Sequence, residues 1–125
     1  MQHDLHIFKA FSDETRLRIL FLLAERQLCV CEIVAVLDAP QGRISRRLAQ
    51  LKHSGLVTDR RDGTWIYYGL ATPAHDLARR LVAYLKKDAG SLEVVQQDRQ
   101  RLDDLADQGR ICVPNPAYVP VTSKN

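Results

Sequence analysis

Residues 41–70 read QGRISRRLAQLKHSGLVTDRRDGTWIYYGL, and the spacing of the apolar side chains changes in the middle of this stretch. The first half predicts a helix from about Pro40 to Ser54, whose core-facing residues fall at i, i+4 and i+7: Ile44, Leu48 and Leu51. Gly55 follows, at the position where a residue in the left-handed region commonly ends a helix. The stretch therefore begins with an amphipathic helix that has a defined end.

The second half of the stretch has the composition of β-strands. Leu56 to Arg60 and Trp65 to Leu70 are rich in β-branched and aromatic residues, and they flank Asp62-Gly63. An Asp-Gly pair between two such segments is typical of a type I′ hairpin turn. We therefore predict a two-stranded wing directly after the helix.

Three helices are predicted before this stretch. A short first helix has an aromatic face (Leu5, Phe8 and Phe11), and Ser12 is the expected N-cap of a second helix that ends near Glu25. Residues 27–37 predict a short strand-like segment that runs into a third helix, and residues 38–40 (Asp-Ala-Pro) separate it from the fourth. Two helices joined by a three-residue break form a helix-turn-helix.

Two more helices are predicted after the wing. Thr72-Pro73 is the expected cap of the fifth, whose apolar face is formed by Leu77, Leu81, Val82 and Leu85. Gly90-Ser91 interrupts the pattern before a highly charged sixth helix, and three prolines after Gly109 predict an extended tail. The expected fold class is mainly α with a small β-wing, that is, a winged helix-turn-helix.

Positive charge is concentrated in one part of the chain. The 125 residues carry a net charge of +3, but residues 41–61 alone carry +5, so the rest of the chain is slightly acidic. This segment has a single acid, Asp59, and six basic residues: Arg43, Arg46, Arg47, Lys52, Arg60 and Arg61. A local basic surface on a slightly acidic body is typical of a protein that binds a polyanion.

The basic residues of the fourth helix share one side with a glutamine, because positions 43, 46, 47 and 50 are spaced i, i+3, i+4 and i+7. Arginine can hydrogen-bond guanine through two donors, glutamine can pair with adenine, and either can hold a phosphate. Which of them meets a base stays open. The predicted contacts to double-stranded DNA are Gln41, Arg43, Ser45, Arg46, Arg47 and Gln50 on the helix and Arg60, Arg61 and Thr64 on the wing.

Four motifs in this order resemble the ArsR/SmtB family of metal-sensing repressors, over about Leu5 to Leu85. They are FSDETRLRIL (11–20), LCVCEI (28–33), ISRRLAQLKHSGL (44–56) and RRDGTWIYY (60–68). The resemblance implies a winged-helix homodimer, paired through its first and fifth helices, that represses a resistance operon and dissociates when an inducer binds. It also implies an operator that is an imperfect inverted repeat.

Within this resemblance, Leu-Cys-Val-Cys looks like the inducer site of the arsenite-responsive members. The chain departs from that pattern at Val34, where the arsenite type often has a third cysteine, and at Pro40 and Gly42, which open the fourth helix. The sixth helix and the tail lie outside the resemblance. We therefore divide the chain into a winged-helix DNA-binding and dimerisation domain (1–90), a charged C-terminal helix (91–108) and an extended proline-containing tail (109–125).

The spacing of Cys29 and Cys31 restricts the backbone that a shared ion would require. Side chains at i and i+2 share a face on a strand but point about 200° apart on an ideal helix. Two thiolates on one ion therefore need extended or distorted backbone where the third helix begins, and the helix N-terminus is expected to lower the thiol pKa. Trivalent arsenic or antimony, As(III) or Sb(III), takes three sulfurs, and Cys112 is the expected third ligand. No organic cofactor is expected.

Alternatives remain at this stage. Cys112 and one of the paired cysteines could form a disulfide in a redox switch, or the inducer could be cadmium, lead or zinc, although tetrahedral zinc usually takes four ligands. A thiol enzyme is disfavoured, because the sequence has no Cys-x-x-Cys, no acid-base pair beside a thiol and no phosphate-cradling loop. A winged helix used only for protein contacts would show no salt-dependent DNA affinity.

The N-terminal sequence has no basic segment followed by an apolar core, and the longest strictly apolar run is Ile19 to Ala24. Neither an export signal nor a membrane span is therefore expected. We expect a cytoplasmic protein with no membrane partner, in which the three cysteines are normally reduced.

Overall fold

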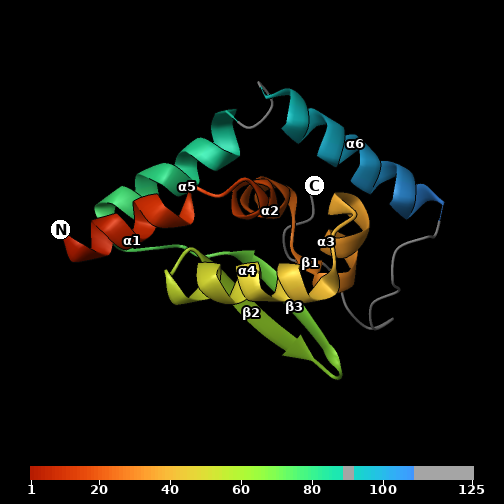
Figure 1. Cartoon of the computed structure of the whole chain (residues 1–125), viewed down its shortest axis with the longest axis horizontal. Helices are drawn as coiled ribbons and strands as arrows, with labels where there is room; N and C mark the ends of the chain where they lie inside the picture. Colours follow the sequence, from red (N-terminus) through yellow and green to blue (C-terminus); the bar gives the residue numbers. More distant parts are fainter. Residues whose placement is uncertain (89–91, 109–125) are drawn as a thin grey trace.

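The computed structural model describes residues 1–88 and 92–108. The elements follow in the order α1 (Gln2–Ala10), α2 (Glu14–Glu25), β1 (Leu28–Cys29), α3 (Val30–Leu37), α4 (Gln41–His53), β2 (Val57–Asp62), β3 (Trp65–Leu70), α5 (Asp76–Asp88) and α6 (Glu93–Asp107). The other helices and the sheet surround α2 (Figure 1). The predicted fold class is confirmed: the chain is mainly helical with a small antiparallel wing, and it contains a helix-turn-helix.

Helix α2 forms the centre of the core, because five consecutive residues, Ile19 to Leu23, are buried from every side. Its N-cap is Asp13, whose Oδ2 accepts a hydrogen bond from the backbone N–H of Arg16 at 2.9 Å. The prediction of Ser12 as the cap is therefore wrong by one residue. The hydroxyl of Ser12 instead donates to the carbonyl of Lys9 at 2.7 Å, at the end of α1.

The helix-turn-helix is formed by α3 and α4. Asp38 ends α3 in the left-handed region, with φ 52°, and Pro40 precedes the first residue of α4. At the other end of α4, Gly55 has φ +86° and its N–H reaches the Lys52 carbonyl, while the N–H of Leu56 reaches the Leu51 carbonyl. This pair of hydrogen bonds is a Schellman motif. The predicted glycine stop is confirmed, and the predicted core residues Ile44, Leu48 and Leu51 are buried.

The sheet has three antiparallel strands in the order β1-β3-β2, so the wing is joined by the short strand β1 that leads into α3. Strand β2 runs to Asp62, and Asp62 pairs with Trp65, which leaves Gly63 and Thr64 as the turn. Among residues other than glycine in the described chain, only Asp38 has a positive φ, so Thr64 does not. A type I′ turn needs a positive φ at both central residues, whereas type II′ needs it only at the first. The predicted type I′ turn is therefore wrong, and the positive φ of Gly63 alone fits type II′.

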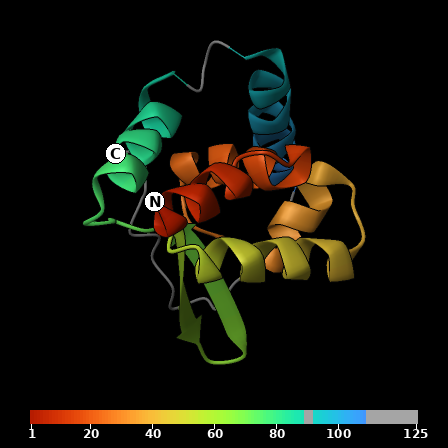
Figure 2. The ribbon, with the colours of Figure 1, turned by 60° about the vertical axis from the view of Figure 1, so that its left-hand side comes forward.

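The two outer helices α1 and α5 lie side by side (Figures 1 and 2). Helix α5 begins at Asp76, so the predicted cap at Thr72-Pro73 is wrong. Helix α1 buries Ile7 and Ala10, whereas Leu5 and Phe8 of the predicted apolar face are exposed, at 51% and 56% accessible. The third predicted residue, Phe11, follows the helix and packs partly against the core. The exposed apolar surface of α1 therefore lies on the outside of the single chain.

Helix α6 packs across α2 and α3 and contributes Val95 and Leu102 to the core (Figure 2). Its Asp98 is buried and accepts two hydrogen bonds from the Arg18 guanidinium of α2, at 2.8 and 2.9 Å. Arg101 donates from Nε to the carbonyl of Ala35 in α3 at 3.3 Å. No helix in the described part of the chain combines the length and the apolar character needed to cross a bilayer.

Candidate DNA-binding surface and cysteine pair

Helix α4 turns most of its predicted DNA-contacting side chains to solvent. Gln41, Arg43, Ser45 and Arg46 are all exposed, while the opposite side of the helix is buried. The wing, β2 and β3, lies next to α4 at the same side of the molecule (Figure 1). The structure therefore presents an arginine-bearing helix and an adjoining hairpin on one surface, an arrangement that suits a helix in the major groove and a hairpin beside it.

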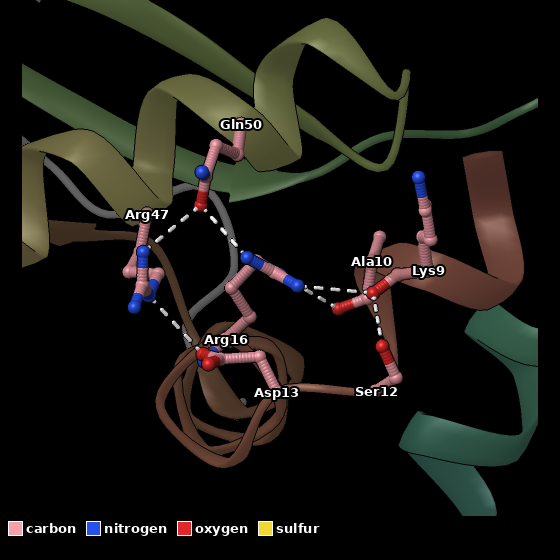
Figure 3. A network of polar contacts seen from close by, with 7 residues as sticks. All are labelled: Lys9, Ala10, Ser12, Asp13, Arg16, Arg47 and Gln50. Carbon is pink, nitrogen blue, oxygen red and sulfur yellow. Dashed lines mark hydrogen bonds and ion pairs between the residues drawn. The ribbon is translucent and has the colours of Figure 1, made fainter.

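Two of the predicted DNA contacts on α4 are engaged within the chain. Arg47 Nε forms an ion pair with Asp13 Oδ2 at 3.1 Å, and Arg47 Nη1 donates to Gln50 Oε1 at 3.4 Å. Gln50 Oε1 also accepts a hydrogen bond from Arg16 Nη1 at 2.8 Å. Figure 3 shows both side chains directed back toward the start of α2. Arg47 and Gln50 therefore help to fix α4 on α2, whereas Arg43 and Arg46 remain directed outward.

Sequence analysis did not identify Arg16 and Asp13 as part of this surface. Asp13 has a pKa below its usual value, mainly because it accepts the Arg16 backbone N–H and also because the Arg47 and Arg16 guanidinium groups lie close to it. Arg16 and Gln50 are 34 positions apart in the chain. No local pattern predicts a contact over that separation, because it depends on how α2 and α4 pack.

The wing residues also divide into two groups. Arg61 and Thr64 are exposed, at the end of β2 and in the turn. Arg60 is half-buried, with its guanidinium carbon 5.1 Å from the centre of the Tyr67 ring, and it donates to Gln27 Oε1 at 3.4 Å. Arg60 therefore packs on the wing, and Arg61 and Thr64 are the wing side chains directed to solvent.

The two neighbouring cysteines meet where β1 ends and α3 begins. Cys29 pairs with Tyr67 of β3, and its backbone is extended, with φ −87° and ψ 168°. Cys31 lies in the first turn of α3 and is half-buried. The Sγ atoms of Cys29 and Cys31 are 3.2 Å apart. The expected extended backbone is thus present, and it brings both sulfurs to one place.

The environment of Cys29 is opposite to the one expected from a helix N-terminus. Its side chain is buried, and burial, followed by the negative charge of Glu32, raises the pKa of the thiol to about 11. Glu32 is held there because its Oε1 accepts the backbone N–H of Cys29 at 2.9 Å. The predicted lowering of the thiol pKa is therefore wrong for Cys29: loss of solvation and the Glu32 charge outweigh the backbone hydrogen bonds that lower the pKa.

The remaining cysteine, Cys112, lies outside the described residues. Within residues 1–88 and 92–108, no three histidine, cysteine, aspartate or glutamate side chains are close enough together to hold a metal ion.

Comparison with known proteins gives a family match over the helix-turn-helix. Residues 13–59 match the family described as bacterial regulatory protein, arsR family. The arsenic resistance transcriptional regulator ArsR2 of Pseudomonas putida is 51% identical over 65 residues, which are 51% of this chain and 56% of that protein. The arsenical resistance operon repressor of Escherichia coli is 48% identical over 68 residues, which are 54% of this chain and 58% of the repressor. The aligned part spans a little over half the length of these relatives.

A solved structure extends the likeness over most of the winged helix. The homodimeric winged helix-turn-helix DNA-binding domain of Mb0332 from Mycobacterium bovis has 32% sequence identity and a TM-score of 0.59, covering 72% of this chain and 81% of that one. The matched family and these relatives are transcriptional regulators.

Proposed function

Because the chain belongs to the ArsR family of bacterial regulatory proteins, we propose that it is a metalloid-responsive transcriptional repressor. In this proposal it binds the operator of a resistance operon and dissociates when As(III) or Sb(III) binds its cysteine thiolates. The observation that carries the proposal is the 3.2 Å separation of the Cys29 and Cys31 sulfurs at the start of the helix-turn-helix. The names of the Pseudomonas putida and Escherichia coli relatives, which are regulators of arsenic resistance, support the same inducer class.

The DNA-binding part of the proposal rests on the outward side of α4 and on the wing. Arg43 and Arg46 are exposed and reach the groove from α4, and Arg61 and Thr64 extend the surface along the hairpin. A homodimer paired through α1 and α5 presents two copies of this surface, which suits an imperfect inverted repeat. The exposure of Leu5 and Phe8 on α1 supports that pairing, because large apolar side chains on a helix surface are typical of an interface.

The sulfur pair suits a soft ion. The Sγ atoms of Cys29 and Cys31 lie 3.2 Å apart, near enough for both to bind one ion. Soft thiolate ligands favour soft ions. Tetrahedral zinc usually takes four protein ligands, whereas the chain has three cysteines, so we propose As(III) or Sb(III) with Cys112 as the third sulfur.

The proposed response passes through the backbone at Cys29. Cys29 belongs to β1, which pairs with the wing strand β3, and the next residue begins α3, the first half of the helix-turn-helix. An ion held by Cys29, Cys31 and a third sulfur favours one backbone geometry at this junction and disfavours the one that suits DNA. A coupling of about 1–3 kcal/mol per site reduces operator affinity about 5- to 150-fold.

A redox-responsive repressor of the same fold is the second candidate, because Cys29 and Cys31 lie at the junction of β1 and α3 and a disulfide between one of them and Cys112 would constrain that junction. In that case oxidation, rather than an ion, changes the junction between β1 and α3. As a DNA-binding regulator, the protein is proposed to act in the cytoplasm in either case.

One titration tests the two candidates together. The reduced full-length protein is bound to its own upstream DNA and titrated with arsenite, antimonite, cadmium, zinc and peroxide. We expect arsenite and antimonite to release the DNA, and the double substitution Cys29→Ser with Cys31→Ser to abolish the release while DNA affinity is retained. Release by peroxide alone would support the redox candidate.

The third sulfur is tested separately. Cys112→Ser should weaken arsenite-driven release if this residue binds the ion, and unchanged sensitivity would remove it from the site. Release by arsenite that persists in the Cys29→Ser, Cys31→Ser protein would refute the proposed inducer site.

A further inference from the structure

A cleft lies between the C-terminal end of α1 and the last turns of α4, with a volume of about 350 Å³. Its lining includes four residues that can carry positive charge, namely His6, Lys9, Arg16 and His53, and it includes no acidic residue. The chain as a whole has 15 acidic residues against 18 lysines and arginines, so a cleft whose ionisable side chains are all basic is a local feature. The cleft therefore favours an anion.

Arg16 gives this cleft a partly buried source of positive charge. It is half-buried, and its guanidinium donates to three neutral oxygens: the carbonyls of Lys9 and Ala10, at 3.0 and 3.2 Å, and Gln50 Oε1, at 2.8 Å (Figure 3). A guanidinium has five N–H donors, so two remain after these contacts. Asp13 lies close to Arg16, and its carboxylate also forms an ion pair with Arg47.

The walls of the cleft come from two elements with different predicted roles. His6 and Lys9 stand on α1, and His53 stands on α4, with the rings of His6 and His53 centred 6.5 Å apart. Gln50 lines the cleft and is also part of the predicted DNA-reading side of α4, and His53 follows it by three positions on the same helix. The cleft is thus continuous with the proposed DNA surface.

We propose that this cleft binds a phosphate of the DNA backbone beside the base pairs that α4 reads. The inference rests on the proposed operator binding and deepens it, because it brings α1, the proposed dimer helix, into the DNA contact. A phosphate held by His6, Lys9, Arg16 and His53 fixes where α4 sits along the duplex without reading its sequence. In a dimer, one phosphate bound in each cleft also fixes the position of each α4 helix relative to the DNA, and so the distance between the two helices.

The salt dependence of operator affinity tests this site. Lys9→Gln removes one charge but keeps the Lys9 carbonyl that holds Arg16, and Lys87→Gln, in the exposed last turn of α5, is the matched control. Each lost phosphate contact lowers the slope of log affinity against log salt by about 0.9, or about 1.8 for a dimer. If the affinities of variant and wild type agree when extrapolated to about 1 M salt, this slope corresponds at about 0.1 M salt to an affinity loss of about 60-fold for a dimer. The loss should be equal for operator and scrambled DNA.

The possible results separate this inference from the proposed function. The phosphate site is overturned if Lys9→Gln leaves the slope of log affinity against log salt unaltered, or if Lys87→Gln changes that slope equally. Operator binding by the wild-type protein is not affected by either result. If the wild-type protein shows no preference for operator over scrambled DNA, the proposed function fails, and the phosphate site fails with it. Inorganic phosphate that binds the DNA-free protein at micromolar concentration and displaces operator would assign the cleft to a free anion and overturn the proposal.

Discussion

Cadmium binding should tighten steeply as the pH rises from about 6.5 to about 8.5, whereas arsenite binding should change little over the same range. The difference follows from Cys29, whose thiol has a pKa of about 11 because it is buried and lies beside Glu32. At both pH values this thiol is protonated in the free protein. Any ion that binds its sulfur must therefore displace the proton.

The magnitude can be worked out for each ion. A divalent cation releases the Cys29 proton to solvent, so its apparent affinity rises about tenfold per pH unit, or about 100-fold over the two units, from this thiol alone. Arsenite is present as neutral As(OH)₃. When an As–O bond is replaced by As–S, the hydroxide leaves with the thiol proton as water, and no proton is released. A thiol with a raised pKa therefore disfavours divalent cations relative to arsenite.

The assay is calorimetric titration of the reduced full-length protein in two buffers of different ionisation enthalpy, which counts the released protons directly. Cys29→Ser is the matched control. In this variant the slope of log cadmium affinity against pH should be lower by about one than in the wild-type protein. A cadmium affinity that varies by less than about threefold over the range would refute the argument. So would an arsenite affinity that rises as steeply as that of cadmium.

Three further predictions concern the framework of the site. Asp98→Ala should lower the free energy of unfolding by about 3 kcal/mol, because it leaves the Arg18 charge without its carboxylate, whereas Asp103→Ala on the exposed side of α6 should change it by less than about 0.5 kcal/mol; equal urea midpoints for the two variants would contradict this. Phe8→Asp should weaken dimerisation by about tenfold or more with helix content unchanged, since this side chain is exposed on the single chain; an unaltered dimer in sedimentation equilibrium would exclude α1 from the interface. Gly55→Ala should cost about 1–2 kcal/mol, as measured by thermal unfolding, because the position has φ +86° and an added Cβ meets no other atom; an unchanged melting temperature would show that the helix end adapts.

The helix-turn-helix and the wing could be predicted from the sequence because the signals are local. The spacing of Ile44, Leu48 and Leu51, the glycine at position 55 and the strand-rich residues after it all act over a few positions. Three local details were wrong: the cap of α2 is Asp13 and not Ser12, the hairpin turn is of another type, and α5 begins at Asp76, after the cap predicted at Thr72-Pro73. In each case neighbouring residues could take the same role, and side-chain identity did not decide between them.

The chemistry of the candidate site was harder to predict, because it depends on contacts between distant segments. The pKa of Cys29 is raised first by the burial that accompanies the pairing of β1 with β3 and then by the charge of Glu32, whereas the sequence suggested a lower pKa from the helix N-terminus. The hydrogen bond from Arg16 to Gln50 depends on the packing of α2 against α4. Of the apolar face predicted for α1, Leu5 and Phe8 are exposed on the single chain, whereas Phe11 follows the helix and packs partly against the core.

Strand β1 has only two residues, yet it places Cys29 next to both elements of the proposed DNA-binding surface. On one side Cys29 faces Tyr67 across the sheet, and β3 continues from there into the hairpin; on the other side α3 begins and leads to α4. A change in the backbone at this residue therefore affects both the hairpin, through β3, and α4, through α3. Loss of operator affinity then does not require a large displacement of either element, because a small tilt of the helix relative to the hairpin already prevents both from fitting one duplex.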